Sequence, residues 1–299
     1  MKKYIKYIVI AIMVLSIMAG IIVAYTRKNK EIKEDDNFKI VTSFYPIYVM
    51  TANIVDGAKN VTLDNMTEAN TGCVHNYTLT TSDMKKIEKA NVFIENGLGL
   101  EDSFNKIVES KPNLEIIDSS SQMSDLIEDE GEDETNPHIW TSISKNIQQV
   151  KNITNALKEK NPENADIYEK NCNKYVEKLE NLKKEYEEEL DLKGEKAVTL
   201  NENFAYFAKE IGLNLKLIHT SHEETALSGE TLKNVIDEMK SSNGKIILVD
   251  IDEDTRTAKT ISKETGANIF VLDSATTGSL DKDAYINAMK QNLEILKAK

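Results

Sequence analysis

The sequence predicts an α/β protein in which two parallel-sheet lobes are joined by one long helix and preceded by an apolar N-terminal segment. Short β-branched and aliphatic runs alternate with amphipathic segments on both sides of the chain's middle, a pattern typical of parallel sheets with crossover helices. The stretch from Pro162 to Leu190 contains no glycine and no further proline, and 299 residues suit two lobes better than one. We expect the first lobe at 38–161, the linking helix at 162–191 and the second lobe at 192–299.

The N-terminal segment has the features of a membrane span. Residues 1–30 carry lysine and arginine but no acidic side chain, and an uncharged, mostly aliphatic stretch runs from Tyr7 to Thr26. This stretch matches the ~20 residues that cross a bilayer as a helix and exceeds the core of an ordinary signal peptide. Because residues 1–72 contain no cysteine, a lipid-modified cysteine is excluded there. We expect residues 1–30 to be an uncleaved membrane anchor or, as the alternative, a cleaved signal segment. A tether at 31–37 then leads to a folded body on the extracytoplasmic side of the cell membrane.

The first lobe opens with a β-branched run that ends at Tyr45-Pro46 and predicts a strand at 38–44. The next segments follow the helical and strand periodicities in turn. We expect a helix at 47–54, a strand at 61–63, a helix at 82–90 capped by Ser82, and a strand at 91–94.

Apolar side chains recur every three or four residues along the linking segment and predict one buried face of a helix about 40 Å long. These side chains are Tyr168, Cys172, Tyr175, Leu179, Leu182, Tyr186 and Leu190. After Gly194 the strand and helix patterns return. We expect strands at 197–200, 214–219, 245–249 and 268–272, alternating with helices at 204–211, 230–240, 255–265 and 282–297.

Charge and composition exclude several classes of protein. With 37 basic and 50 acidic residues the formal charge is −13, which argues against nucleic-acid binding because phosphate contacts need clustered lysine and arginine. Two cysteines rule out a disulfide framework and a four-cysteine zinc finger, and we expect both thiols to be reduced. The four histidines limit any histidine-based metal site to His75, His138, His219 and His222.

Four short features place reactive or ligating side chains in loops. His75 lies in Thr71-Gly72-Cys73-Val74-His75-Asn76-Tyr77, and His138 lies in Asn136-Pro137-His138-Ile139-Trp140. Asn201-Glu202-Asn203 and Asp273 each follow a predicted strand, and ligands of open α/β sheets bind beyond the carboxyl ends of the strands. Each feature alone is weak evidence for a binding site, since a single histidine in a loop is common in proteins without one.

Taken together, these segments resemble the zinc- or manganese-specific substrate-binding proteins of ABC transporters over about residues 38–299. The segments that carry the resemblance are Thr42-Ser43-Phe44-Tyr45-Pro46-Ile47-Tyr48, Gly72-Cys73-Val74-His75-Asn76-Tyr77, Lys85-Lys86-Ile87-Glu88-Lys89-Ala90, Glu95-Asn96-Gly97-Leu98-Gly99-Leu100-Glu101, Asn136-Pro137-His138-Ile139-Trp140, Phe204-Ala205-Tyr206-Phe207-Ala208 and Leu272-Asp273. Their order, combined with the long mid-chain helix, makes the resemblance specific.

The resemblance implies a divalent metal ion held between the lobes by two side chains from each. His75 and His138 stand at the two histidine positions of the family, and Asp273 stands at the carboxylate of the second lobe. The remaining position, three residues before Phe204, is histidine or glutamate in the family and Asn201 here. A neutral amide is a weak ligand for Zn²⁺.

Several groups can take the place of the missing ligand. Glu202, one residue along, is our first expectation, and Asn201 retained beside three strong ligands and water is the second. His219 or His222 can reach in from the loop after the neighbouring strand, although a solvated surface pair is the ordinary interpretation. Cys73 can supply a thiolate, but C-x-H spacing on one loop is tight for two ligands of one ion.

The resemblance implies capture of a scarce ion for a membrane permease, with no bond chemistry, and we expect a monomer. We expect Zn²⁺ rather than Mn²⁺, because the affinity order favours zinc at most nitrogen–oxygen sites. The acidic run at 125–134 is expected to be a solvated loop, or alternatively a weak attractor of cations near the site. Two other classes stay open: a zinc-dependent hydrolase with an open coordination position, and a surface protein of the same fold with a degenerate, weak metal site.

Overall fold

The computed structural model describes residues 16–22, 37–75, 77–104, 110–128, 135–200, 202–217 and 228–298. Residues 16–22 are helical, and most of the span expected from Tyr7 to Thr26 lies outside the described residues. Across the described ranges, no helix combines the length and the apolar character that crossing a membrane requires.

The first sheet has four strands in the order β2-β1-β3-β4, and β1, β3 and β4 run parallel. The strands are β1 (Phe38–Thr42), β2 (Val61–Asn65), β3 (Val92–Glu95) and β4 (Glu115–Asp118). The register pairs Ile40 with Val92 and Ile94 with Ile117, so aliphatic side chains stack across the centre of the sheet. The sequence predicted β1, β2 and β3 but not the edge strand β4.

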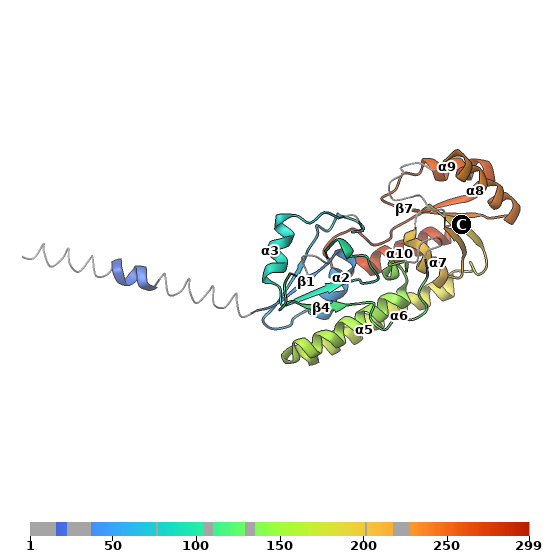
Figure 1. Cartoon of the computed structure of the whole chain (residues 1–299). Helices are drawn as coiled ribbons and strands as arrows, with labels where there is room; N and C mark the ends of the chain where they lie inside the picture. Colours follow the sequence, from blue (N-terminus) through green and yellow to red (C-terminus); the bar gives the residue numbers. More distant parts are fainter. Residues whose placement is uncertain are drawn as a thin grey trace, which may run out of the picture. The chain divides into compact units, whose positions relative to one another are not determined.

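Two helices cover this sheet near the site (Figure 1). α2 spans Tyr45–Ile54 and begins with Pro46 in its first turn, where a missing N–H costs nothing. α3 spans Thr81–Lys89, and its cap is Thr80 rather than the expected Ser82. Thr80 and Asp83 form a reciprocal capping box, which satisfies two N–H groups that a cap at Ser82 would leave open.

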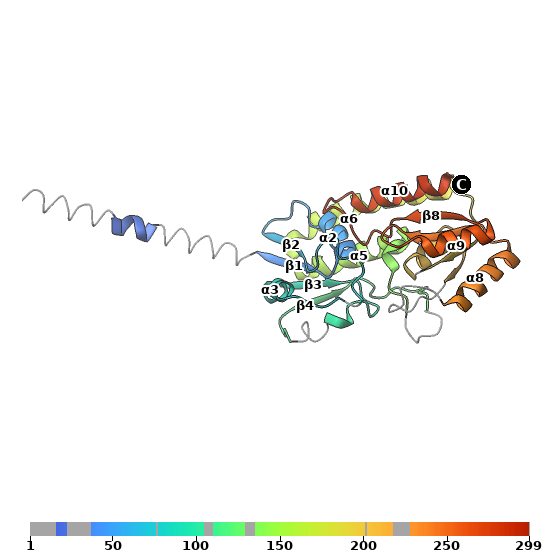
Figure 2. The same cartoon turned by 90° about the horizontal axis from the view of Figure 1, so that it is seen from above.

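The linking helix α6 (Ala165–Glu189) follows a single 3₁₀ turn at Pro162–Asn164. The six predicted apolar positions from Tyr168 to Tyr186 are all buried, whereas Leu190 caps the helix and is only half-buried. α5 (Ile143–Lys160), which the sequence analysis did not predict, lies alongside α6. The last helix, α10 (Ala284–Lys297), also packs against α6 (Figure 2). The linking helix is therefore one member of a three-helix layer.

The second sheet repeats the first, with four parallel strands in the order β6-β5-β7-β8. Its elements are β5 (Lys196–Thr199), α7 (Ala205–Glu210), β6 (Asn214–Leu217), α8 (Gly229–Ser242), β7 (Ile246–Asp250), α9 (Arg256–Thr265) and β8 (Asn268–Leu272). Ile247, Val249, Val235 and Ile261 belong to a core that joins the sheet to α8 and α9. The predicted two-lobed α/β architecture is confirmed, while the division at 162–191 stays a prediction.

Hydrogen bonds tie loops of one lobe to the other. The Tyr45 hydroxyl donates to the main-chain oxygen of Ser279 at 2.8 Å, and the amide of Asn53 donates to the oxygen of Lys282 at 2.8 Å. Gly278 lies against Tyr45 so closely that a Cβ there would meet the hydroxyl oxygen at 2.4 Å. The segment after β8 is thus held against α2, which fixes where the carboxyl end of β8 faces.

Candidate metal centre

His75 is presented by the loop that joins β2 to α3. Val74 is fully buried and anchors this loop in the core, and the Tyr77 hydroxyl donates to Asp83 of the capping box at 3.0 Å. The His75 side chain keeps 27% of its surface exposed, while its Nε2, the atom that faces Glu202, is buried. Contacts on both sides of His75 thus hold the loop in place.

His138 lies in a short loop before the 3₁₀ turn η2 (Ile139–Thr141) and is 1% exposed. The amide of Asn96, at the end of β3, donates to the oxygen of Pro137 at 2.9 Å. The Tyr206 hydroxyl, from α7 of the other lobe, donates to the oxygen of Asn136 at 2.8 Å. Both lobes therefore hold the backbone on which His138 sits.

The side chain of Asn136 orients the His138 ring. Its Oδ1 accepts the backbone N–H of His138 at 2.9 Å and lies 3.2 Å from the ring Nδ1. A backbone N–H can only donate, which fixes the amide with its oxygen toward the histidine, so the Nδ1 contact requires a hydrogen on Nδ1. Nε2 then carries the lone pair, the arrangement that outer-shell acceptors impose on metal-binding histidines.

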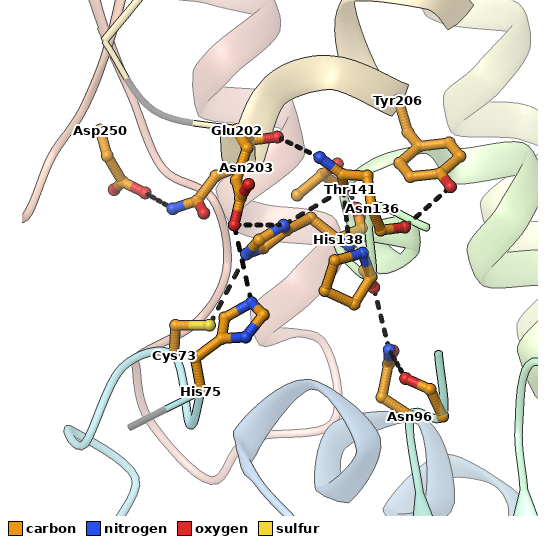
Figure 3. A network of polar contacts seen from close by, with 12 residues as sticks. Cys73, His75, Asn96, Asn136, His138, Thr141, Glu202, Asn203, Tyr206 and Asp250 are labelled. Carbon is orange, nitrogen blue, oxygen red and sulfur yellow. Dashed lines mark hydrogen bonds and ion pairs between the residues drawn. The ribbon is translucent and has the colours of Figure 1, made fainter. Parts of the chain in front are cut away.

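Glu202 reaches the two histidines from the second lobe. It begins the 3₁₀ turn η4 (Glu202–Phe204) that follows β5. Its Oε1 lies 3.6 Å from Nε2 of His75 and 3.8 Å from Nδ1 of His138, and its side chain is 13% exposed (Figure 3). The two rings are themselves 5.3 Å apart between centroids. Residues far apart in sequence thus converge on one small volume.

Cys73 completes a cluster of possible metal ligands. One ligand atom each from Cys73, His75 and His138 lies within 4.8 Å of the others, and Sγ of Cys73 is 3.6 Å from Nε2 of His138 (Figure 3). Burial raises the pKa of the Cys73 thiol to about 12, so the sulfur is a neutral thiol when no cation is bound. Cys172, the other free cysteine, is buried on α6 as expected.

Asp273 lies at the carboxyl end of β8, where the sequence analysis placed it. Its Oδ1 accepts the N–H of Ala275 at 2.7 Å, and its backbone is bonded twice to the Asn292 side chain of α10. Burial raises the pKa of Asp273, and the nearby carboxylates of Asp250 and Asp252 raise it further. Among the described residues, Asp273 is not part of the close cluster that Cys73 forms with the histidines.

Three other candidates, Asn201, His219 and His222, lie outside the described residues, as does 129–134 of the acidic run. The described start of that run is bonded to α7: Asp125 pairs with Lys209 at 2.7 Å, and the N–H of Ile127 donates to the Tyr206 hydroxyl at 3.0 Å. The sequence analysis assigned no role to Asn136 or Tyr206. The Asn-Pro-His order was the available signal for Asn136, whereas no local pattern marks Tyr206.

The fold and the cluster indicate a class: a two-lobed α/β binding protein whose histidine-containing cluster is a candidate metal centre. The family model of the periplasmic zinc-uptake complex component A (ZnuA) matches residues 40–299. The metal ABC transporter substrate-binding lipoprotein ScbA of Streptococcus cristatus is 32% identical over 235 residues, covering 74% of this chain and 76% of that protein.

Two further metal-binding proteins are similar to this chain. The zinc-binding protein AdcA of Streptococcus pyogenes is 28% identical over 300 residues, covering 90% of this chain and 57% of that protein. The structure of the substrate-binding protein FpvC from Pseudomonas aeruginosa with Mn²⁺ superposes with a TM-score of 0.78 at 26% identity, covering 88% of this chain and 97% of that one. The chain belongs to the ZnuA family of metal-binding ABC-transporter substrate-binding proteins. It is a binding protein and not an enzyme, which excludes the zinc-dependent hydrolase.

Proposed function

We propose that this protein captures Zn²⁺ between its two lobes on the extracytoplasmic side of the membrane and delivers it to an ABC permease. The observation that carries the proposal is the approach of Glu202 of the other lobe to the histidine pair: its Oε1 lies 3.6 Å from Nε2 of His75, and the rings of His75 and His138 are 5.3 Å apart between centroids. A four-coordinate zinc ion sets nitrogen and oxygen ligands about 3.4 Å apart, given bond lengths near 2.1 Å. Nε2 of His75 and Oε1 of Glu202, 3.6 Å apart, are therefore spaced as two ligands of one ion.

We assign His75, His138 and Glu202 as ligands, with Asp273 as the further carboxylate of the second lobe. Glu202 supplies the strong oxygen donor that Asn201 lacks. The alternative of a degenerate, weak metal site is therefore not needed to account for Asn201. These four imidazole and carboxylate donors favour Zn²⁺ over Mn²⁺ by the general affinity order. Relatives of both kinds support the metal class: AdcA is a zinc-binding protein and the FpvC structure holds Mn²⁺.

Ion release follows from small movements of the lobes in this proposal. The lobes share hydrogen bonds through Tyr45 and Tyr206 in addition to α6, and such ties favour tilting over a wide hinge opening. A lobe tilt that moves the η4 turn by about 1–2 Å would take Glu202 out of bonding distance of zinc. Metal–oxygen bond lengths vary by only about 0.2 Å. Docking on the permease would supply that tilt.

Metal analysis and a competition titration test the proposal. Full-length protein, purified in detergent, should retain about one Zn²⁺, and a chromophoric chelator should report tighter binding of Zn²⁺ than of Mn²⁺. His75→Ala and His138→Ala should each weaken Zn²⁺ binding by about 100-fold. Glu230→Gln, an exposed change at the start of α8, is the control and should bind as the wild type does. Unchanged zinc affinity in both histidine variants would contradict the site.

We further propose that residues 7–26 anchor the protein in the membrane. The segment is uncharged and mostly aliphatic, and no cysteine precedes residue 73 to carry a lipid. Membranes washed with alkaline carbonate should retain the protein, and its mass should include the N-terminal segment. Release into the wash with a shortened N-terminus would show a cleaved signal peptide instead.

A further inference from the structure

We propose that Cys73 is itself a ligand of the captured ion and makes the site selective for Zn²⁺ over Mn²⁺. The inference rests on the proposed function, because it concerns the same metal centre, but it adds a soft sulfur donor to a set of nitrogen and oxygen donors. The sequence analysis ranked Cys73 low, because two ligands from C-x-H seemed too close together. The structure removes that objection.

The loop geometry directs Cys73 and His75 to the same side. Residues 71–74 have no regular secondary structure and His75 lies in a turn, in which the N–H of Tyr77 donates to the main-chain oxygen of Val74 at 3.0 Å. Val74, the residue between, is fully buried in the core. Cys73 and His75, on either side of Val74, each place a ligand atom within 4.8 Å of the other and of His138, and Figure 3 shows them side by side beneath His138.

The distance from Cys73 to His138 matches that of two ligands on one zinc ion. With a zinc–sulfur bond of about 2.3 Å, a zinc–nitrogen bond of about 2.05 Å and a tetrahedral angle, sulfur and nitrogen stand about 3.6 Å apart. Sγ of Cys73 and Nε2 of His138 are 3.6 Å apart. The cluster of Cys73, His75 and His138, all within 4.8 Å, thus has the dimensions of a preformed three-ligand face.

The nitrogen that faces Cys73 is the one able to bind a metal. Asn136 holds the hydrogen of the His138 ring on Nδ1, so the lone pair of Nε2 points at the sulfur. An ion that enters between the two atoms forms one bond to Nε2 and one to Sγ, and the thiol proton leaves to solvent as the metal–sulfur bond forms. Glu202 then supplies an oxygen donor from the opposite lobe and completes four-coordination, so on this inference Cys73 takes the ligand position given above to Asp273, which is not part of the close cluster among the described residues.

A thiolate changes which ion the site prefers. Soft thiolate ligands favour Zn²⁺ and Cu⁺, whereas Mn²⁺ suits carboxylate, carbonyl and water oxygens. A site with one thiolate and two imidazoles therefore binds zinc more tightly while gaining little for manganese. On this inference, Cys73 is the residue that makes the affinity for Zn²⁺ higher than the affinity for Mn²⁺.

Cobalt substitution of the full-length protein in detergent tests the ligand directly. A cysteine thiolate bound to Co²⁺ gives an intense near-ultraviolet charge-transfer band that nitrogen and oxygen ligands do not give. We expect this band in the wild type and in Cys172→Ser, the matched control whose cysteine lies on α6, and its loss in Cys73→Ser. Circular dichroism confirms that both variants fold. The wild-type spectrum alone already tests the inference if a variant does not fold.

Competition titrations with Zn²⁺ and Mn²⁺ on the same three proteins test the selectivity. We expect Cys73→Ser to lower zinc affinity by about 10- to 100-fold and to leave manganese affinity within a few-fold. One bound Co²⁺ without the charge-transfer band overturns the inference and leaves the proposed function intact. An unchanged zinc-to-manganese ratio in Cys73→Ser also overturns it. Failure of the wild type to bind Co²⁺ or Zn²⁺ overturns the inference and the proposed function together.

Discussion

The indole Nε1 of Trp140 donates a hydrogen bond to the main-chain oxygen of Ser274, 3.0 Å away, across the two lobes. Trp140 is two residues beyond His138, and its ring lies 5.1 Å from the imidazole between centroids. Ser274 directly follows Asp273. The buried side chain of Trp140 therefore contacts both the histidine loop of the first lobe and the carboxylate loop of the second.

Trp140 is the chain's single tryptophan, so its fluorescence should report metal binding without a label. We expect Zn²⁺ to change the emission saturably with about one equivalent, because a cation on His138 alters the field at the indole and the contact with Ser274. The measurement is a fluorescence titration of the full-length protein. His138→Ala should abolish the change, and Trp140→Phe should remove the signal while zinc still binds. A zinc-independent emission from a protein that holds zinc would contradict this coupling.

Much of the fold could be predicted because its elements carry their own periodic signals. The apolar face of α6 was predicted from Tyr168 to Tyr186, since a long helix shows its pattern over many turns. α5 escaped prediction although Ile143, Ile147 and Val150 recur at the same spacing. β4 has only one buried residue, Ile117, between charged and exposed neighbours, because an edge strand needs little apolar surface.

The site could be predicted only where a residue type is rare. Four histidines made His75 and His138 conspicuous, whereas Glu202 is one of three consecutive polar residues in the sequence, and its direction is set by the η4 turn. The sequence left Glu202 and Asn201 as alternatives, because a one-residue shift in a tight turn depends on tertiary packing. Cys73 was undervalued for a similar reason: the folded loop brings its sulfur within 3.6 Å of Nε2 of His138, and no local pattern in the sequence marks that contact.

Substitutions should show which of Glu202, Asn201 and the two loop histidines supplies the ligand that the family places three residues before Phe204. Glu202→Gln keeps the size of the side chain and removes its charge, and we expect it to weaken Zn²⁺ binding by about 10- to 100-fold. Asn201→Ala and the double change His219→Ala with His222→Ala should alter zinc affinity by only a few-fold. Chelator competition on all the variants under one set of conditions gives the ranking. Asn201→Ala costing more than Glu202→Gln would return the ligand role to the amide.

Tyr206→Phe should destabilise the fold and loosen the His138 loop. The hydroxyl donates to the oxygen of Asn136 and accepts the N–H of Ile127, so its removal deletes two hydrogen bonds. We expect a loss of about 1–3 kcal/mol in the free energy of unfolding, measured by urea denaturation of the metal-free protein.

Tyr175→Phe is the matched control for this loss. Tyr175 is 2% exposed on α6, and within the described part of the chain its hydroxyl is buried without a hydrogen-bond partner. Removing a buried, unpaired hydroxyl should be neutral or slightly stabilising. Equal stabilities of the two variants would mean that the bonds of Tyr206 contribute nothing beyond the packing of its ring.

Glu95→Gln should flatten the dependence of stability on pH. Burial, followed by the neighbouring Asp118 and Asp102 carboxylates, raises the pKa of Glu95 to about 7 from its usual value of 4.5. Between these two values the native state holds a proton that the unfolded chain has lost, so the free energy of unfolding falls as the pH rises. The stability associated with protonated Glu95 is fully present below about pH 4.5 and is lost by about pH 7, a change of about 1–3 kcal/mol.

Urea denaturation at about pH 5 and about pH 8 measures this slope. The wild type should lose more stability over that interval than Glu95→Gln, which cannot ionise at this position. Some slope should remain in the variant, because burial also raises the pKa of Glu101, to about 8, with the same sign. Glu88→Gln, an exposed change on α3, should keep the full wild-type slope. If Glu95→Gln and Glu88→Gln have identical slopes, the carboxyl of Glu95 ionises in the native state as it does in the unfolded chain.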